Sequence, residues 1–159
     1  MRWLRPALLA SLLIVAPGAR ATVDCTVTAV SLIFPAYDTL NISDGVTNLT
    51  VACVRATGGA QTAPYTIALS TGSGTYAART MTSGAETLNY NLYTTAARNI
   101  VWGDGSGATQ QVAGAISVPG GAKVTVTATH TVYGRISAPQ NVAAGTYVTT
   151  SPIVVTVTY

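Results

Sequence analysis

Few residues of this chain belong to types that could do chemistry, and the two cysteines, Cys25 and Cys53, are the most informative of them. In an exported protein an isolated cysteine pair is expected to form a disulfide, because the compartment is oxidising and no other thiol competes. A metal site is not expected, because neither thiol has further ligands near it in the sequence. The sequence therefore predicts a Cys25–Cys53 disulfide that ties the first strand of the mature chain to the second.

The remaining reactive residue types do not form a catalytic set. His130 is the single histidine, and it alternates with Val126, Ala128 and Val132 on one face of an expected strand, where a structural imidazole is the simpler interpretation. The acids are scattered without a glycosidase-like pair, and the serines in glycine-rich turns lack a nucleophile elbow. The Gly103–Gly107 segment has one carboxylate and no lysine, so it predicts a hairpin turn rather than a calcium or phosphate loop. We therefore expect no catalytic residue, no metal and no cofactor.

The first residues predict export. Arg2 and Arg5 precede an apolar run, Ala7–Ala16, that is too short to span a bilayer. A small-x-small cleavage signal ends at Ala21, so residues 1–21 are interpreted as a secretory signal peptide. The alternatives are an uncleaved anchor and an ordinary buried helix. Cleavage would leave one domain, residues 22–159, without a transmembrane segment.

Removing the signal peptide changes the charge of the protein. The chain carries a formal net charge of +3, but this excess comes from the arginines of the signal peptide. The remaining basic residues are Arg55, Arg79, Arg98, Lys123 and Arg135, and the acidic residues are Asp24, Asp38, Asp44, Glu86 and Asp104. The mature protein is formally neutral, so its charge gives no reason to expect a nucleic-acid partner.

The elements that must position these residues are strands. Stretches rich in Thr, Val, Ile and Tyr alternate with turns rich in Gly, Ser, Asn and Pro. The expected strands are Thr26–Phe34, Val46–Val54, Tyr65–Ser70, Thr87–Thr94, Asn99–Trp102, Gln110–Ser117, Ala122–Ile136 and Pro152–Tyr159. Short strands at this spacing predict an all-β sandwich or barrel.

The last expected strand raises the question of what it pairs with. Ile153, Val155, Val157 and Tyr159 fall on one face, following the two-residue period of a strand. Its backbone groups need partners, because unpaired buried ones are costly. The partner could be the strand's own sheet, another subunit or an assembly factor.

Several sequence blocks resemble one known family. They are Phe34–Asp38, Val51–Cys53, Tyr65–Leu69, Ala78–Met81, Leu88–Thr94 continuing through Ala97-Arg98 to Val101–Gly105, Val132–Ile136, Gln140, Ala144–Tyr147 and the C-terminal Val155–Tyr159. In this order they resemble the spore coat protein U domain family, which includes the subunits of archaic, Csu-type chaperone–usher pili. The resemblance covers essentially the whole mature chain.

The resemblance implies a fold and a mechanism. It implies an immunoglobulin-like β-sandwich that lacks its last strand and so leaves a groove beside the C-terminal strand. A periplasmic chaperone fills the groove, and at an outer-membrane usher the N-terminal segment of a neighbouring subunit replaces it by β-strand addition. Carried onto this chain, Ile153, Val155, Val157 and Tyr159 become groove residues, and the Tyr159 carboxylate becomes the group that the chaperone anchors. The protein would then be a structural pilus subunit that passes through the periplasm to the cell surface.

One feature departs from the family pattern. Shaft subunits of the family carry a donor segment before their first cysteine, whereas cleavage after Ala21 leaves Thr22–Asp24, about 10 Å of extended chain. This predicts a subunit that accepts a strand but does not donate one, such as a tip or terminating subunit. The alternative within the family is a spore-coat or other cell-surface component.

Two further interpretations stay open at this stage. One is a closed sandwich in which the C-terminal residues are simply core. The other is an adhesive, glycan-binding domain with an aromatic platform. The candidate platform residues are Tyr65, Tyr76, Tyr90, Tyr93, Tyr133, Tyr147 and Trp102.

Overall fold

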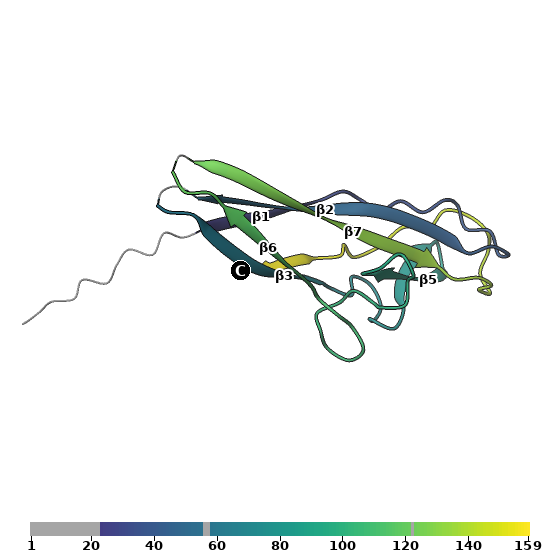
Figure 1. Cartoon of the computed structure of the whole chain (residues 1–159). Coiled ribbons are helices and arrows are strands. Elements are labelled where there is room, and N and C mark those ends of the chain that lie inside the picture. Colours follow the sequence, from purple (N-terminus) through teal and green to yellow (C-terminus); the bar gives the residue numbers. More distant parts are fainter. Residues whose placement is uncertain (1–22, 56–57, 122) are drawn as a thin grey trace, which may run out of the picture.

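The computed structural model describes residues 23–55, 58–121 and 123–159, and these residues form an all-β structure (Figure 1). The predicted signal peptide, Thr22 and Ala122 lie outside the described residues. The strands are β1 (Val23–Ala29), β2 (Ser43–Arg55), β3 (Gln61–Leu69), β4 (Arg79–Ser83), β5 (Glu86–Tyr93), β6 (Val112–Val118), β7 (Val124–Ile136) and β8 (Val155–Thr158). Within the described ranges there is no helix long and apolar enough to cross a membrane.

The strands form two antiparallel sheets that make a sandwich. The five-stranded sheet has the order β1-β2-β7-β5-β4, and the three-stranded sheet has the order β6-β3-β8. The long β2–β7 ladder, from Ser43↔Ile136 to Arg55↔Val124, is the spine of the larger sheet. The prediction of an all-β sandwich is therefore confirmed.

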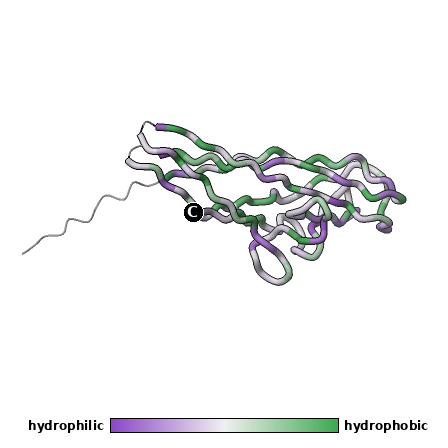
Figure 2. Tube along the Cα trace, in the orientation of Figure 1, coloured by the Kyte–Doolittle hydropathy of each residue, from purple (hydrophilic) through white to green (hydrophobic). Residues whose placement is uncertain are grey.

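The core lies between the sheets because inward and outward residues alternate along each strand. In β2, Leu49, Val51 and Cys53 are buried, and the residues between them are partly exposed. Hydrophobic and polar stretches follow one another along the traces of both sheets in Figure 2. The largest fully buried apolar side chains are Trp102, Ile67, Leu88, Ile136, Val51 and Val118.

Two strand predictions were wrong. The expected strand Asn99–Trp102 makes only isolated bridges, Tyr93↔Val101 and Trp102↔Gln110, because Trp102 crosses between the sheets and donates its indole N–H to the Ile67 carbonyl. Strand β4 was missed. Its inward positions are Arg79 and Met81, and a buried arginine breaks the apolar alternation that sequence reasoning looks for.

The first and last predicted strands exist but are shorter than expected. The first strand ends at Ala29 rather than Phe34, and the last begins at Val155 rather than Pro152. Most of the residues trimmed from both strands line one and the same cavity, as described below; they are Val30, Ser31, Leu32, Phe34, Pro152 and Ile153.

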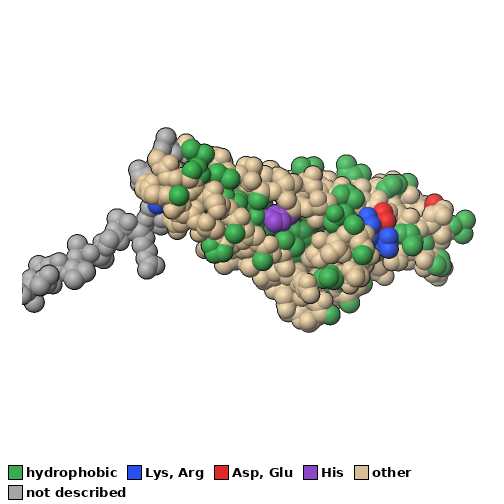
Figure 3. Space-filling view, viewed as in Figure 1, with side chains coloured by type: hydrophobic (Ala, Val, Ile, Leu, Met, Phe, Trp, Pro, Cys, Tyr) green, Lys and Arg blue, Asp and Glu red, His purple; other side chains and the backbone are tan. Residues whose placement is uncertain are grey.

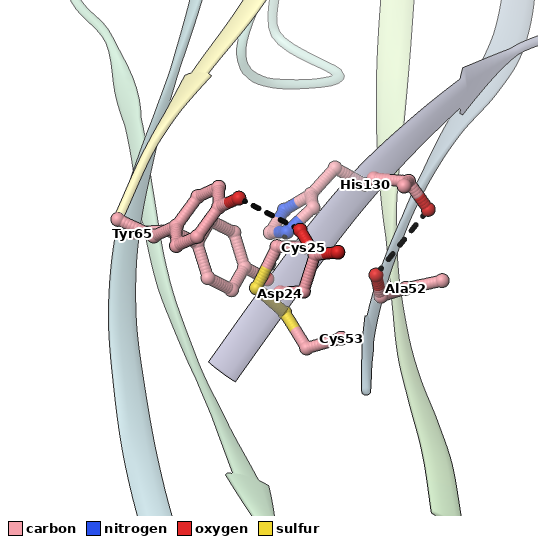
Figure 4. The surroundings of a disulfide bond; sticks show 8 residues. Asp24, Cys25, Ala52, Cys53, Tyr65 and His130 are labelled. Atoms are coloured by element: carbon pink, nitrogen blue, oxygen red, sulfur yellow. Dashed lines mark hydrogen bonds between the residues drawn. A yellow bond between two sulfur atoms is a disulfide. The ribbon is translucent and has the colours of Figure 1, made fainter. Parts of the chain in front are cut away.

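The predicted disulfide is present. Cys25 of β1 and Cys53 of β2 are directly paired in the ladder, and their sulfur atoms are bonded (Figure 4). Because β1 pairs only with β2 among the described residues, the disulfide covalently fixes an edge strand to the sheet.

Charged side chains are sparse on the face of the molecule shown in Figure 3, and most of those visible gather near one end. The ion pairs of the described residues centre on Asp44, which accepts from Arg135 at 2.7 Å and lies 3.3 Å from Arg98. Both arginines hold the carboxyl pKa of Asp44 below its ordinary range, the hydrogen bond from Arg135 being the larger cause. Asp44 and Arg135 are partly exposed, whereas the Arg98 side chain is only 11% exposed, and the cluster is structural.

Candidate functional site

The clearest candidate site is an apolar groove between the end of β1 and the start of β8. It consists of two adjoining cavities of about 300 Å³ and about 290 Å³. Leu32, Phe34, Met81 and Thr149 line both cavities, so the two are parts of one groove. None of the described residues that line it is charged.

One wall of the groove is the segment after β1, residues 31–36, which we call the strap. The last ladder-like contact before it is the bond from the Val30 N–H to the Asn48 carbonyl, at 3.3 Å. Within the described part of the chain the strap makes no backbone–backbone hydrogen bond. Leu32 and Phe34 are half-buried and face inward, whereas Ile33 between them is 80% exposed. The strap is therefore held mainly by its two apolar side chains.

The inward side chains of the strap rest on a pair of glycines. Gly45 of β2 and Gly134 of β7 are direct ladder partners. A Cβ at Gly45 would lie 2.8 Å from the Leu32 side chain, and one at Gly134 would lie 2.7 Å from the Phe34 ring. The phenyl ring also meets Tyr90 edge-to-face at 5.8 Å. Only glycine at both positions leaves room for the strap side chains.

The opposite wall is residues 145–154, which we call the C-terminal wall. Unlike the strap, it is pinned by hydrogen bonds along its length. Gly145 exchanges two backbone bonds with Tyr37, and Val148 exchanges two with Thr82. Val154 donates its N–H to the Ser70 hydroxyl at 2.8 Å and accepts from the Ser70 N–H at 2.9 Å.

Strand β8 continues from this wall as an edge of its sheet. It pairs with β3 from Thr66↔Thr158 to Leu69↔Val155, and no described strand pairs with its other side. Across the opening, Tyr159 donates its hydroxyl to Asp24 of β1 at 3.2 Å. The open edge of β8 and the groove therefore lie on the same side of the sandwich.

The residues predicted for a strand-accepting site occupy different positions in this region. Ile153 and Val155 line the second cavity. Val157 is half-buried against the core, and Tyr159 is 55% exposed. Val154, on the other face, is 58% exposed. The predicted alternation is present, but only its first two members reach the cavity.

The sequence alone did not predict the strap or the pair of glycines, Gly45 and Gly134, on which its side chains rest. The alternation of Val30, Leu32 and Phe34 was visible, but the same alternation fits a paired strand. Gly45 and Gly134 lie inside strand-like runs, where a glycine signals a close approach of other atoms. Their direct pairing depends on the register of two strands far apart in the sequence.

His130 does not belong to a catalytic arrangement. Its Nε2 lies 2.7 Å from the Tyr65 hydroxyl, and the two rings meet edge-to-face (Figure 4). Burial lowers the pKa of His130 below its ordinary value of 6.5. The pair joins β7 to β3 across the sandwich, which is a structural role. Among the residues described, no three His, Cys, Asp or Glu side chains are close enough to hold a metal.

Two other sequence features also take structural roles. Trp102, Tyr65 and Tyr90 are buried in the core, so the aromatic residues do not share one exposed platform. In the Gly103–Gly107 segment, Asp104 accepts bonds from the N–H and hydroxyl of Ser106. The segment leads to a parallel bridge between Trp102 and Gln110, so the predicted hairpin is wrong.

Comparison with known proteins identifies one family. The family model of the Spore Coat Protein U domain matches residues 10–157 of the chain. No curated protein matches the chain significantly.

Proposed function

Because the chain belongs to the Spore Coat Protein U domain family, we propose that it is a secreted structural subunit of a chaperone–usher-type surface pilus. Its groove accepts an extended strand, first from a periplasmic chaperone and then from a neighbouring subunit. The role is structural, and it needs no cofactor.

The observation that carries this proposal is the joint position of the groove and the open edge of β8. An extended segment running along β8 would pair with its free backbone groups and place alternate side chains in the cavities. The uncharged lining of the groove favours apolar side chains on the inserted strand.

The same features explain the need for a chaperone. An exposed edge strand beside an apolar groove is a site of aggregation unless something covers it. A chaperone strand would cover both during passage through the periplasm, and an outer-membrane usher would exchange it for the strand of the next subunit. The mature protein would then reside at the cell surface.

The position of β1 bears on the place of this subunit in the assembly. All of β1 pairs with β2, and Cys25 is bonded to Cys53. Strand β1 is therefore unable to leave its sheet and serve as a donor. If the signal peptide is cleaved after Ala21, about 10 Å of chain precedes Cys25, which favours a tip or terminating subunit.

The experiment that tests the proposal is a matched pair of charge substitutions in β8 and the residue before it. Val155→Asp places a carboxylate at the groove, whereas Val154→Asp places it on the exposed face. Each variant is exported together with a periplasmic chaperone of a chaperone–usher system that forms a complex with the wild-type chain, and the complex is isolated. We expect Val155→Asp to lose the complex and Val154→Asp to keep it. A wild-type domain that is stable, monomeric and indifferent to the chaperone would refute the proposal.

A further inference from the structure

A hydrogen bond between Tyr159 and Asp24 crosses the opening beside β8, and we infer that it is a latch that an incoming strand must break. This inference rests on the proposed function and concerns the regulation of the same site. The latch closes one end of the opening in the free subunit, and breaking it is part of the cost of accepting a strand.

The first basis is the position of the hydrogen bond. Among the described strands, β8 pairs only with β3 and β1 pairs only with β2, so each has a free edge, and the two strands lie close together in opposite sheets. Tyr159 follows the end of β8, and its hydroxyl donates to the Asp24 carboxylate of β1 at 3.2 Å. The Tyr159 side chain therefore runs from one free edge to the other.

The second basis is the path of an added strand. A strand that pairs with the free edge of β8 lies about 4.8 Å from it and directs alternate side chains between the two sheets. Beside Val155 the way inwards is open, because this residue lines a cavity. Beyond Thr158 the same way is crossed by the Tyr159 side chain. A strand that pairs along β8 to its end must therefore break the bond to Asp24.

The third basis is that the two halves of the latch are held differently. Asp24 lies next to Cys25, whose disulfide to Cys53 fixes β1 to its sheet (Figure 4). Tyr159 lies outside β8 and is 55% exposed. Its side chain can turn away without disturbing a strand or the core. Opening the latch therefore costs one exposed hydrogen bond and no local unfolding.

The test uses the exported chain, separated from its chaperone, and a fluorescent synthetic peptide of alternating valine and threonine that reaches from the groove to the end of β8. Tyr159→Phe removes the hydroxyl and keeps the ring. Because the lost bond exists only in the free chain, this variant should bind the peptide about threefold tighter in fluorescence anisotropy. Its thermal midpoint without peptide should fall by about 2 °C. These opposite signs distinguish a latch from a contact that only stabilises the fold.

Three further variants serve as controls. Asp24→Ala should also tighten binding, and combining it with Tyr159→Phe should bring no further gain, because both remove the same bond. Asp24→Asn keeps an acceptor, so its affinity should stay near that of the wild type. Thr26→Val removes an exposed hydrogen bond of the same strand, from the Thr26 hydroxyl to the Ala52 carbonyl at 3.4 Å, which points to β2 rather than across the opening. It should leave the affinity for the peptide unchanged.

The outcomes separate the two proposals. If Tyr159→Phe binds the peptide no tighter than the wild type, or if Thr26→Val shows the same gain, the contact is not a latch, although the protein still accepts strands. If neither the wild type nor any variant binds the peptide, acceptance of a strand at this edge is refuted, and the proposed function and the latch fall together.

Discussion

The apolar groove contrasts with a neighbouring part of the sandwich, the region around Arg79, which is held together by buried hydrogen bonds. We call this region the Arg79 corner. Arg79 is fully buried, and its guanidinium donates to the carbonyls of Ser70 and Trp102 and to the side-chain oxygen of Asn91. It also lies over the Tyr76 ring, 5.4 Å from the centroid. Burial lowers the pKa of the guanidinium.

Asn91 extends this network in both directions. Its amide donates to the Tyr76 carbonyl at 2.8 Å, and its side-chain oxygen accepts from the Leu92 N–H at 2.9 Å. The corner therefore joins β4, β5 and the end of β3 through buried, satisfied polar groups. Such networks fix one arrangement, because each member left without a partner is costly.

The strap shows the opposite organisation: its side chains are apolar anchors, and it makes no backbone–backbone hydrogen bond to the residues that the structure describes. The Arg79 corner is connected to the C-terminal wall, the other side of the groove, through Ser70. Its carbonyl accepts from Arg79, while its N–H and hydroxyl bind Val154 of the C-terminal wall. The two walls of the groove are therefore held differently, one by hydrogen bonds that lead back to the polar corner and the other by apolar side chains.

The largest expected effect is a difference in amide hydrogen exchange between the two regions. The Trp102 N–H, bonded to the Leu92 carbonyl at 2.9 Å, should exchange only through global or near-global unfolding. The N–H groups of Ser31–Phe34 and Ala36 should exchange close to their intrinsic rates, and Pro35 has no N–H. We expect protection factors that differ by about 10³ or more, measured by mass spectrometry or NMR. Equal protection would show that the strap is as firmly held as the corner.

The next largest effect is that of Arg79→Met on stability. Methionine fills much of the space but leaves the Ser70 and Trp102 carbonyls without the donor that Arg79 supplies, each costing about 1–3 kcal/mol, whereas the Asn91 oxygen keeps the Leu92 N–H. We expect a loss of about 4 kcal/mol in the free energy of unfolding, measured in urea. Because Ser70 also holds Val154, the same variant should increase exchange along the C-terminal wall.

Arg135→Met provides the matched control for this substitution. Arg135 forms an exposed ion pair with Asp44, and such a pair contributes up to about 1 kcal/mol. If the two variants were destabilised equally, the buried network would have no special role in the corner.

A somewhat smaller effect on stability is expected from removing the disulfide between β1, which precedes the strap, and β2. Replacing Cys25 and Cys53 together by alanine opens a loop with a sequence separation of 28, which the chain-entropy model values at about 3–4 kcal/mol. The variant should unfold at lower urea and accumulate less in the periplasm. Wild-type protein treated with a reductant should match it, and unchanged stability in both would contradict the prediction.

The contrast between the Arg79 corner and the groove also explains which parts of the fold and of the site could be predicted from the sequence. Strands β2 and β7 were predictable because one buried face imposes a two-residue period on them, and the disulfide followed from an isolated cysteine pair in an exported chain. The Arg79 corner was not predictable because its inward residue is charged, which breaks the apolar alternation expected of a buried strand face. The close packing of the strap was not predictable because it depends on the direct pairing of Gly45 with Gly134, and register is a property of the whole sheet.

The smallest expected effect concerns His130, which sequence reasoning already interpreted as structural. Burial depresses its pKa in the folded protein below the ordinary 6.5, so the folded state favours the neutral imidazole, whose Nε2 meets the Tyr65 hydroxyl. The unfolded chain takes up a proton first as the pH falls. This contribution to stability is therefore complete above about pH 6.5 and declines as the pH falls through that value towards the lower folded pKa. The Asp44 carboxyl, whose pKa is also lowered, affects stability in a separate pH range, below its ordinary pKa of 3.8.

Urea unfolding between about pH 8 and 5 should show the decline in stability in the wild type and a weaker decline in His130→Gln, which keeps a polar partner for Tyr65. Identical pH profiles would mean that the imidazole is as well solvated in the sandwich as in the unfolded chain.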